Sequence, residues 1–492
     1  MKKLVAFPWY IVFLPVFFIL HAYNNYFGLI PVPFFAKYLL YYLLLATVLC
    51  FIGWWLFKNR IKSGIFTISF LIIFFFFGSA YDFLQRIHVP SFLVSYKFLI
   101  TLIVVFLLLL ALFLRRKPAP LKAHQFFFLL FSVLMAIEIC TSLYYIFSGK
   151  NNDPAIKNPP LALQLKPGTS QPDIFFIVFD EYTSSKALKK YYRFDNTALD
   201  STLENDGFFI SHDSKSNYNS TVISMSSTLN LQYFNRPMEN TDNDARVLME
   251  GALSLSRSYL PKLLEQQGYQ IINYGLFDIG SHKASGPRPF LSYEASAISL
   301  ETLWGRIQRD ILWNLTIRLP GYSDKKLGDK DYIERNQSNL RKFVRELSIP
   351  SPMPRLVLCH LLLPRRPFQV DRNGNARITS MEDFKDGNHD SLYLEQVIYA
   401  NKLIDSIGKA AIKDRQRPLV VIIEGDHGNR YAAWGMNIRE KHFMNLNTYY
   451  FSDKDYSMLY DSISPVNSFR VVLNKYFNTG LPLLKDSTIL LH

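Results

Sequence analysis

Two adjacent carboxylates stand at the end of an apolar run. Ile174–Phe179 is an unbroken stretch of Ile, Phe and Val, and Asp180 and Glu181 come directly after it. A run of this length and composition predicts a strand buried on both faces, as in a parallel sheet. Ligands bind at the carboxyl end of such strands, and buried anions there require a cation. The pair therefore indicates a divalent metal site, with a helix N-cap at Asp180 as the alternative.

A second apolar run ends in a comparable way. Leu419–Ile423 is followed by Glu-Gly-Asp426-His427-Gly. A carboxylate oxygen and an imidazole nitrogen both suit a divalent ion, and the flanking Gly425 and Gly428 let the backbone approach a ligand closely. An ordinary turn with an Asp cap and a surface His is the alternative. Because two strands would end in such residues, a metal site is the favoured interpretation.

Hydroxyl side chains cluster between these two runs. The stretch 216–230 holds Thr221, Ser224 and Thr228 in a segment typical of a loop that enters a helix. Helix N-termini favour anions, so a hydroxyl there could attack a phosphate or sulfate ester. A metal ion would help by lowering the pKa of that hydroxyl. Taken alone, the composition favours a Ser/Thr-rich helix cap without chemistry.

The elements that must position these residues alternate along the chain. We expect strands at Ile174–Phe179, Gly207–Ser211, Gln270–Tyr274, Leu356–Leu361 and Leu419–Ile423, and helices at Val247–Gln267, Ile333–Leu347 and Ser391–Ile412. This alternation predicts an α/β domain with a mostly parallel central sheet over residues 173–492. Residues 149–172 are rich in Pro, Asn, Lys and Gly, which predicts a linker before that domain.

Five apolar stretches precede the linker and account for much of the 49% hydrophobic and 15% aromatic composition. They cover residues 4–22, 36–57, 65–83, 98–114 and 124–147. Each is close to or above the roughly 18–20 residues that cross a hydrocarbon core as a helix. Residues 1–148 are therefore predicted to form a transmembrane domain of five spans.

Positive charges are concentrated on one side of these spans, because every second connecting segment is basic. They gather before the first span, between the second and third, and between the fourth and fifth, at Lys2, Lys3, Lys58, Arg60, Lys62, Arg115, Arg116, Lys117 and Lys122. The positive-inside rule then predicts a cytoplasmic N-terminus and an extracytoplasmic domain after five spans in the inner (plasma) membrane. A small-x-small cleavage site does not follow the first stretch, so we expect a retained anchor. The net charge of +14 draws on these loops, which argues against nucleic-acid binding.

Glu138 is an ionisable residue inside the fifth stretch. Such a residue is either a functional candidate or one partner of an interhelical hydrogen bond. The cysteines give no redox signal: Cys50 and Cys140 fall in spans, and Cys359 alone falls in the outer domain. An intradomain disulfide and a cysteine zinc cluster are thereby excluded.

Together the three sites resemble the alkaline phosphatase superfamily, in the order of a strand ending in Asp, a Thr in a hydroxyl-rich loop, and a strand ending in Asp-His-Gly. The similarity is greatest to the membrane-anchored sulfatase-like branch, which includes the lipoteichoic acid synthases and the lipid A phosphoethanolamine transferases. Those families also have five N-terminal spans and an outer catalytic domain. Thr221-Val-Ile-Ser224 resembles the nucleophile segment of the transferases. Glu-Gly-Asp426-His427-Gly resembles the Ser-Asp-His-Gly signature.

The resemblance implies one metal ion held by Asp180, the nucleophile Thr221, Asp426 and His427. Zinc or manganese is the metal expected, with calcium or magnesium as further options. Glu181 matches the second acidic ligand of true sulfatases. A Cys/Ser-x-Pro-x-Arg motif is missing near Thr221, which disfavours classical sulfatase chemistry.

A further segment, Cys359-His360-Leu-Leu-Leu-Pro-Arg365, resembles the family's His-x-x-x-Pro-His segment, with Arg365 in place of the second His. Arginine can hold a phosphate through a charged fork but cannot transfer a proton near neutral pH. His360 could bind phosphate or a second metal, or be a core residue. Arg430 and His442 are further candidates for substrate contact, or else surface residues.

The implied function is that of a membrane-bound, metal-dependent phosphotransferase. It would take a phospho-alcohol head group, similar to phosphoethanolamine or glycerophosphate, from a membrane phospholipid to an envelope lipid or glycan through a phospho-Thr221 intermediate. The alternatives are a sulfatase-like hydrolase of sulfate or phosphate esters and a degenerate, non-catalytic member. The donor, the acceptor and the oligomeric state stay open.

Overall fold

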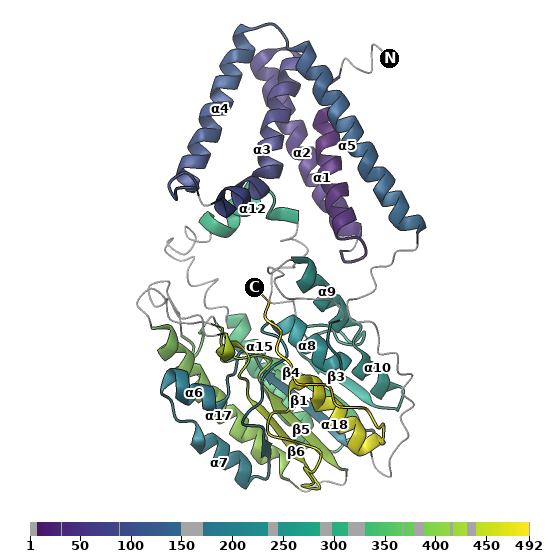
Figure 1. Cartoon of the computed structure of the whole chain (residues 1–492), viewed down its shortest axis with the longest axis vertical. Helices are drawn as coiled ribbons and strands as arrows, with labels where there is room; N and C mark the ends of the chain where they lie inside the picture. The colour runs from purple at the N-terminus through teal and green to yellow at the C-terminus, as the bar shows by residue number, and fades with distance from the viewer. Residues whose placement is uncertain are drawn as a thin grey trace. The chain divides into compact units, whose positions relative to one another are not determined.

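The computed structural model describes residues 7–30, 32–87, 89–148, 171–234, 245–285, 298–312, 330–366, 368–377, 388–413, 417–430 and 439–491. They belong to two compact units (Figure 1). The first unit comprises Met1–Asn152 and Leu291–Leu315, and the second comprises Asp153–Phe290 and Thr316–His492. Most of the predicted linker, together with Lys2 and Lys3, lies outside the described residues.

The first unit contains the apolar helices of the N-terminal part of the chain. They are α1 (Tyr10–Asn25), α2 (Val32–Phe57), α3 (Arg60–Arg86), α4 (Tyr96–Arg116) and α5 (Leu121–Phe147). By length and composition, α2 to α5 can each cross a membrane, whereas α1 is a shorter apolar helix of 16 residues. At 1.5 Å per residue α1 extends about 24 Å, somewhat less than a hydrocarbon core of about 30 Å. Four of the five predicted spans therefore have the full length.

Polar contacts at two levels fix α1 against α5. Near the start of both helices, Tyr10 Oη lies 3.1 Å from His124 Nδ1. Farther along both, Asn24 Nδ2 donates to Glu138 Oε2 at 2.6 Å, and His21 Nδ1 lies 2.8 Å from Glu138 Oε1. The two helices therefore run in the same direction. Glu138 is a partner in an interhelical hydrogen-bond cluster, one of its two predicted roles.

The second unit is built on a six-stranded sheet in the order β2-β6-β5-β1-β4-β3. Its strands are β1 (Asp173–Phe179), β2 (Phe209–Ile210), β3 (Gln270–Tyr274), β4 (Arg355–Leu361), β5 (Leu419–Glu424) and β6 (Asn447–Phe451). The neighbouring strands β5, β1, β4 and β3 pair in parallel, whereas β6 is antiparallel to both β5 and β2. The sheet is thus mixed, with a parallel part that contains β1 and an antiparallel edge.

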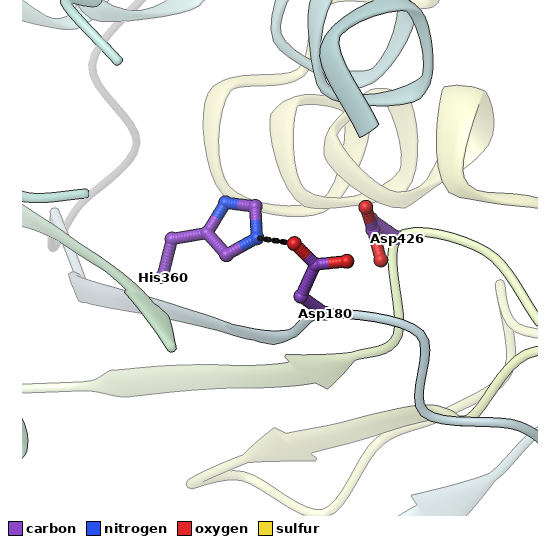
Figure 2. A group of neighbouring side chains, drawn as sticks. All are labelled: Asp180, His360 and Asp426. Atoms are coloured by element: carbon purple, nitrogen blue, oxygen red, sulfur yellow. Dashed lines mark ion pairs between the residues drawn. The ribbon is translucent and has the colours of Figure 1, made fainter. Parts of the chain in front are cut away.

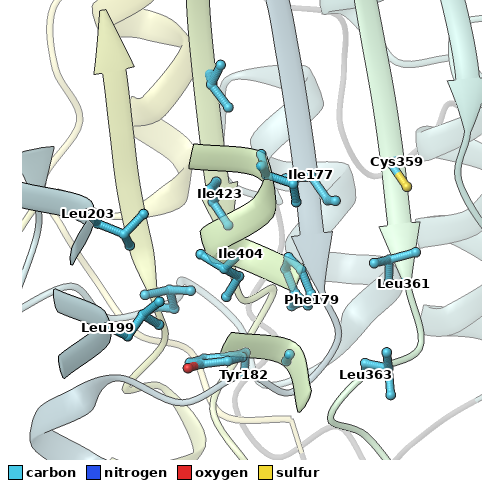
Figure 3. Close-up of a cluster of buried hydrophobic side chains, with 14 of the residues drawn as sticks. Ile177, Phe179, Tyr182, Leu199, Leu203, Cys359, Leu361, Leu363, Ile404 and Ile423 are labelled. Atoms are coloured by element: carbon cyan, nitrogen blue, oxygen red, sulfur yellow. The ribbon is translucent and has the colours of Figure 1, made fainter. Parts of the chain in front are cut away.

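Helices cover both faces of this sheet. The side chains of α6 (Ser185–Tyr192), α7 (Thr197–Asn205), α15 (Lys330–Ser348) and α17 (His389–Ala411) pack with one face (Figure 3). The side chains of α8 (Thr221–Asn230), α9 (Ala245–Ser256), α10 (Tyr259–Glu265) and α18 (Pro465–Phe477) pack with the other. Burial on both faces explains why β1, β4 and β5 are apolar runs without alternation.

The alternating side-chain directions along β1 determine on which face of the sheet the candidate site lies. Phe175, Ile177 and Phe179 point to the α17 side, and Phe176 and Val178 point to the α8 side. Because successive side chains point to opposite faces of a sheet, the next residue of this series, at position 180, is directed to the α8 side. Helix α8 therefore lies over the end of β1 where the acidic pair begins.

Candidate metal and nucleophile site

The carboxyl ends of three adjacent strands supply the acidic and imidazole groups of the site. Asp180 directly follows β1, and His360 is the second-last residue of β4. Asp426 is the second residue after the end of β5. Since these strands are neighbours and parallel, their carboxyl ends meet at one edge of the sheet. Figure 2 shows Asp180 between His360 and Asp426. All three side chains are buried.

Thr221 is the first residue of α8, and Ser220 is the N-cap. Its hydroxyl oxygen lies 3.2 Å from His427 Nε2 and 3.5 Å from Asp180 Oδ1. The positive end of the helix dipole and the amides of the first helical turn favour an anion beside this hydroxyl. The sequence prediction that Thr221 stands where a loop enters a helix is confirmed.

Three distances between candidate donors are close to the edge length of a tetrahedral metal site. His427 Nε2 lies 3.4 Å from Asp426 Oδ2, which adds a third distance to those of Thr221. A tetrahedron with metal–ligand bonds of about 2.1 Å has edges of about 3.4 Å. Asp426 Oδ2 is also fully buried without a hydrogen-bond partner among the described residues. Among the described residues, two groups have ligand atoms within 4.8 Å of one another and could hold a metal ion. One is Asp180, His360 and Asp426, and the other is Asp180, Glu181 and His427.

His427 presents its Nε2 atom to the site. Nδ1 lies 2.9 Å from the carbonyl oxygen of Gly428 and must donate its proton to it. Burial and the nearby Arg430 lower the pKa of His427 to about 4. The ring is therefore neutral near neutral pH, with the lone pair of Nε2 directed at Thr221.

Asp426 is held by two neighbouring segments. The amide of Glu181 donates to Asp426 Oδ1 at 3.0 Å, and the hydroxyl of Ser224 donates to the carbonyl oxygen of Asp426 at 2.6 Å. Burial and the nearby Asp180 raise the pKa of the Asp426 carboxyl to about 7. Two carboxylates this close require a cation if both are to stay ionised.

Asp180 already has cationic and imidazole neighbours. Arg365 Nη1 donates to Asp180 Oδ2 at 2.9 Å and lies 3.5 Å from Thr221 Oγ1. His360 Nε2 lies 3.8 Å from the same carboxylate oxygen. Burial alone would raise the pKa of Asp180, but Arg365 and His360 hold it well below its usual range. Arg365 thus reaches both the carboxylate and the hydroxyl of the site.

Glu181 has a different set of contacts. Its Oε1 accepts hydrogen bonds from Arg430 Nε at 3.1 Å and Nη2 at 2.9 Å, while its carbonyl oxygen accepts one from Tyr393 Oη at 2.7 Å. Its φ of 64° lies in the left-handed region, which costs a non-glycine residue about 1 kcal/mol. One of its carboxylate oxygens also lies within 4.8 Å of ligand atoms of Asp180 and His427. Glu181 could therefore serve a metal ion or position Arg430.

The remaining candidates, His360, Arg430 and His442, contact the site in different ways. His360 joins Asp180 and Asp426 in a second possible ligand group. Arg430 also donates to the carbonyl oxygen of Asn219, two residues before Thr221. The carbonyl oxygen of His442 accepts a hydrogen bond from the amide of Gly428, so this residue supports the loop.

Gly425 and Gly428 are required by close packing. A Cβ atom on Gly425 would lie 2.2 Å from the carbonyl oxygen of Tyr182, and one on Gly428 would lie 2.1 Å from that of Lys441. The loop of Asp426 and His427 is thus pressed against the chain that follows β1 and the chain that precedes β6. From the sequence we expected these glycines to let the backbone approach a ligand, whereas the atom nearest to a Cβ at either position is a backbone carbonyl oxygen.

Some residues that contact the site could not be identified from sequence patterns. Tyr393, on α17, donates to the backbone of Glu181, and Ser224, on α8, donates to the backbone of Asp426. Ser224 falls within the hydroxyl-rich segment, which was the only available signal for it. Tyr393 is one aromatic residue of a buried helix face and gives none.

Comparison with known proteins returned structural likeness only. No family model matches the sequence, and no curated protein matches it. The zinc complex of the C-terminal periplasmic domain of EcEptC from Escherichia coli is 15% identical, with a TM-score of 0.40 over 65% of this chain and 86% of that one.

Two further solved structures are similar at the same level. The soluble domain of lipooligosaccharide phosphoethanolamine transferase A from Neisseria meningitidis is 13% identical, with a TM-score of 0.37 over 63% of this chain and 89% of that one. A 2-O GAG sulfatase is 13% identical, with a TM-score of 0.39 over 65% and 73%. The chain is thus similar to solved phosphoethanolamine transferase and sulfatase structures, and the chemistry of its site rests on its own residues.

Proposed function

We propose that this chain is a membrane-bound, metal-dependent phosphotransferase with Thr221 as its nucleophile. The observation that carries the proposal is the position of the Thr221 hydroxyl. It starts a helix and lies 3.2 Å from His427 Nε2 and 3.5 Å from Asp180 Oδ1, two residues that belong to possible metal-ligand groups. A hydroxyl that only caps a helix has no need of such neighbours.

The proposed ligands are Asp180, Thr221, Asp426 and His427, with Glu181 as a further one. When bound, a divalent ion such as zinc or manganese would lower the pKa of the Thr221 hydroxyl and stabilise negative charge on phosphate oxygens. His427 is suited to this role because its neutral ring keeps Nε2 available. The bond between Glu181 N–H and Asp426 keeps the two acidic loops together.

The reaction we propose has two steps. In the first, Thr221 Oγ1 attacks the phosphorus of a phospholipid head group, and the bond to the leaving alcohol, such as a diacylglycerol, breaks. Thr221 loses its hydroxyl proton and the departing alkoxide takes one up, so the step is balanced. In the second, a hydroxyl of an envelope lipid or glycan attacks the phosphorus of phospho-Thr221 and loses its proton. The bond between Thr221 Oγ1 and phosphorus breaks, and Oγ1 takes up a proton.

We infer that two guanidinium groups hold the phosphate. Arg365 lies 3.5 Å from the Thr221 hydroxyl, and Arg430 reaches the backbone just before Thr221. Arginine holds phosphate oxygens through paired hydrogen bonds. Because Arg365 cannot donate a proton near neutral pH, we infer that the leaving alcohol receives its proton from water or from the ring of His360.

Helix directions and charges support the membrane location that we propose for this activity. Arg60 and Lys62 stand at the start of α3, and Arg115 and Arg116 at the end of α4, so these ends are assigned to the cytoplasm. Because α1 and α5 run in the same direction, an odd number of crossings through α5 is supported. We therefore retain the predicted division into residues 1–148, 149–172 and an extracytoplasmic 173–492, in the inner membrane, as a proposal.

A hydrolase with the same nucleophile is the second candidate, since water could replace the acceptor. A non-catalytic member is the third, favoured by the ion pair that Arg365 already makes with Asp180. These three functions predict different fates for a labelled head group.

The test uses the full chain reconstituted in liposomes with a phospholipid whose head group is labelled, plus an envelope lipid fraction. Transfer to that fraction supports the transferase, and release into water alone supports the hydrolase. We expect Thr221→Ala to abolish either activity. The matched control is Thr228→Ala, because Thr228 lies on the same helix and its hydroxyl donates to the Ser224 carbonyl oxygen at 3.0 Å. A Thr221→Ala variant as active as the wild type would overturn the proposal.

A further inference from the structure

A segment from the middle of the second unit's sequence belongs structurally to the first unit. Residues 291–315 group with Met1–Asn152, whereas the chain on either side of them belongs to the second unit. The described part, 298–312, contains α12 (Leu303–Ile307) and a π-helical turn (Gln308–Leu312). In Figure 1, α12 lies at one end of α3 and α4. Sequence patterns did not predict that residues 291–315 belong to the first unit.

The backbone of the segment packs directly on α3 at Gly78. The Gly78 amide donates to the carbonyl oxygen of Glu301 at 2.9 Å, and the Ser79 hydroxyl donates to Glu301 Oε2 at 2.6 Å. A Cβ atom at position 78 would lie 2.4 Å from the carbonyl oxygen of Leu300. Only glycine therefore permits this close approach, so the contact between the segment and α3 depends on the residue at position 78.

A charge pair and a tyrosine hold the rest of the segment. Arg306 Nη2 lies 2.5 Å from Asp82 Oδ2, near the end of α3, and Arg306 Nε donates to the Leu300 carbonyl at 2.7 Å. The Arg306 side chain is only 7% exposed. At the start of α4, Tyr96 Oη donates to the carboxylate of Asp310. The segment is thus attached to two consecutive membrane helices.

These attachment points lie at the ends of α3 and α4 opposite to Arg60 and Lys62 and to Arg115 and Arg116. The attachment ends carry one basic residue each, Arg86 and Lys97. Asp82 is four residues from the end of α3, and Tyr96 is the first residue of α4. Under the positive-inside rule this level is the outer boundary of the membrane. Trp304, in α12, is 52% exposed there. Tryptophan is enriched at such boundaries because its ring is both apolar and able to donate a hydrogen bond.

We propose that residues 298–312 form an interfacial anchor, which lies in the outer head-group layer on α3 and α4 and attaches the second unit to the membrane. The surface that Trp304 presents is fitted to lipid head groups and the upper acyl chains. Since the chain enters and leaves this anchor within the second unit, that unit is tied to the membrane unit by more than the linker at 149–172. The anchor would keep the catalytic residues near lipid substrates, but its existence does not depend on the proposed reaction.

The experiment uses the full chain with a protease site inserted between residues 149 and 170. After cleavage in membranes, the fragment that begins at the cut has no covalent link to α1–α5. We expect it to stay with the membranes through a wash at high salt. Release of the wild-type fragment into the wash would overturn the anchor.

Variants separate the anchor from general misfolding. Arg306→Asp and Asp82→Arg should each release the cleaved fragment, and the double exchange should retain it because the charge pair is restored. Arg372→Ala is the matched control, since Arg372 is an exposed arginine of the second unit that pairs with Glu395. Retention in both single variants, or release in the double one, would count against the Arg306–Asp82 contact.

The lipid contact has its own readout. A nitroxide on Trp304→Cys, in a chain with Cys50, Cys140 and Cys359 replaced by Ala, should be more accessible to oxygen than to an aqueous nickel complex. The same label on Arg372→Cys should show the opposite. Equal accessibilities of the two labels to oxygen and to the nickel complex would show that position 304 faces water. This result would contradict the proposed contact with lipid.

Discussion

The guanidinium of Arg365 donates to Asp180 at 2.9 Å and lies 3.5 Å from the hydroxyl of Thr221. One side chain thus contacts both a proposed metal ligand and the proposed nucleophile. Asp180, Glu181 and Asp426 carry three negative charges when ionised, and Arg365 and Arg430 carry two positive ones. The balance between these groups governs how strongly the site attracts a divalent ion.

Removal of Arg365 should tighten metal binding. In Arg365→Ala the site loses one positive charge a few ångströms from the ion, and at short range such a repulsion exceeds the ~1.4 kcal/mol that corresponds to a tenfold change. We expect the dissociation constant for zinc or manganese to fall at least tenfold, measured by titration calorimetry on the full chain in detergent.

The control for that measurement is Arg365→Lys, which keeps the charge and should change the metal affinity little. The same Arg365→Ala protein should bind inorganic phosphate more weakly, because one of two guanidinium groups is lost. Unchanged metal affinity in Arg365→Ala would contradict the proposed proximity of Arg365 to the ion.

Metal affinity should rise with pH between about 6 and 8. The pKa of Asp426 is raised to about 7, so a proton competes with the metal below that pH and is released on binding. For one such group the affinity should increase about tenfold from pH 6 to pH 8. His427, with a pKa lowered to about 4, is already deprotonated in this range and adds no slope.

Asp426→Asn provides the check on this assignment. It should bind metal more weakly and lose the dependence on pH, as seen by calorimetry in buffers that differ in ionisation enthalpy. A slope that persists in Asp426→Asn would assign the titrating proton to another group.

Glu424 should limit stability at high pH. This last residue of β5 is fully buried, and burial together with Asp426 raises the pKa of its carboxyl well above the usual value. Above the unfolded pKa of about 4.3, the unfolded state releases a proton that the folded state keeps. The free energy of unfolding therefore falls as pH rises, by up to about 1.4 kcal/mol per pH unit until the folded carboxyl ionises.

Glu424→Gln removes this proton linkage. The variant should match the wild type near pH 4.5 and should melt at a higher temperature at pH 8, when the metal-free full chain is followed by tyrosine fluorescence. Glu395→Gln is the control, since Glu395 is a half-buried carboxylate whose pKa is lowered by Arg372. A melting difference for Glu424→Gln that does not grow with pH would contradict the prediction.

The parallel part of the fold was predictable because burial on both faces leaves a strong pattern. The predicted strands at 174–179, 270–274, 356–361 and 419–423 agree with β1, β3, β4 and β5 within one residue. The expected strand at 207–211 is only Phe209–Ile210, because it pairs on a short antiparallel edge.

Helix boundaries were harder to obtain. The single helix expected at Val247–Gln267 is divided into α9 and α10 by Arg257 and Ser258, where Ser258 is the N-cap of α10. Apolar periodicity continues across this break, so the pattern alone could not reveal it. Helix α18 was not predicted, since its buried polar residues Asn467, Ser468 and Arg470 obscure its apolar face.

The candidate site was predictable to the extent that its residues follow strand ends. Asp180 and Asp426 lie close together because β1 and β5 are neighbours, which strand order alone decides. The contacts of Arg365 and Arg430 depend on loops whose paths no local pattern specifies. The pairing of Arg430 with Glu181 rather than with a distant carboxylate could not be foreseen.

Trapping the covalent intermediate tests the central claim most directly. The purified full chain, loaded with metal, would be incubated with phospholipid donor without acceptor, quenched in acid, and digested for mass spectrometry. We predict a phospho-head-group adduct on Thr221, its transfer to serine in Thr221→Ser, and its loss in Thr221→Ala. An adduct on Ser220 or Ser224 in place of Thr221, or unmodified Thr221 in a preparation that transfers head groups, would contradict the account.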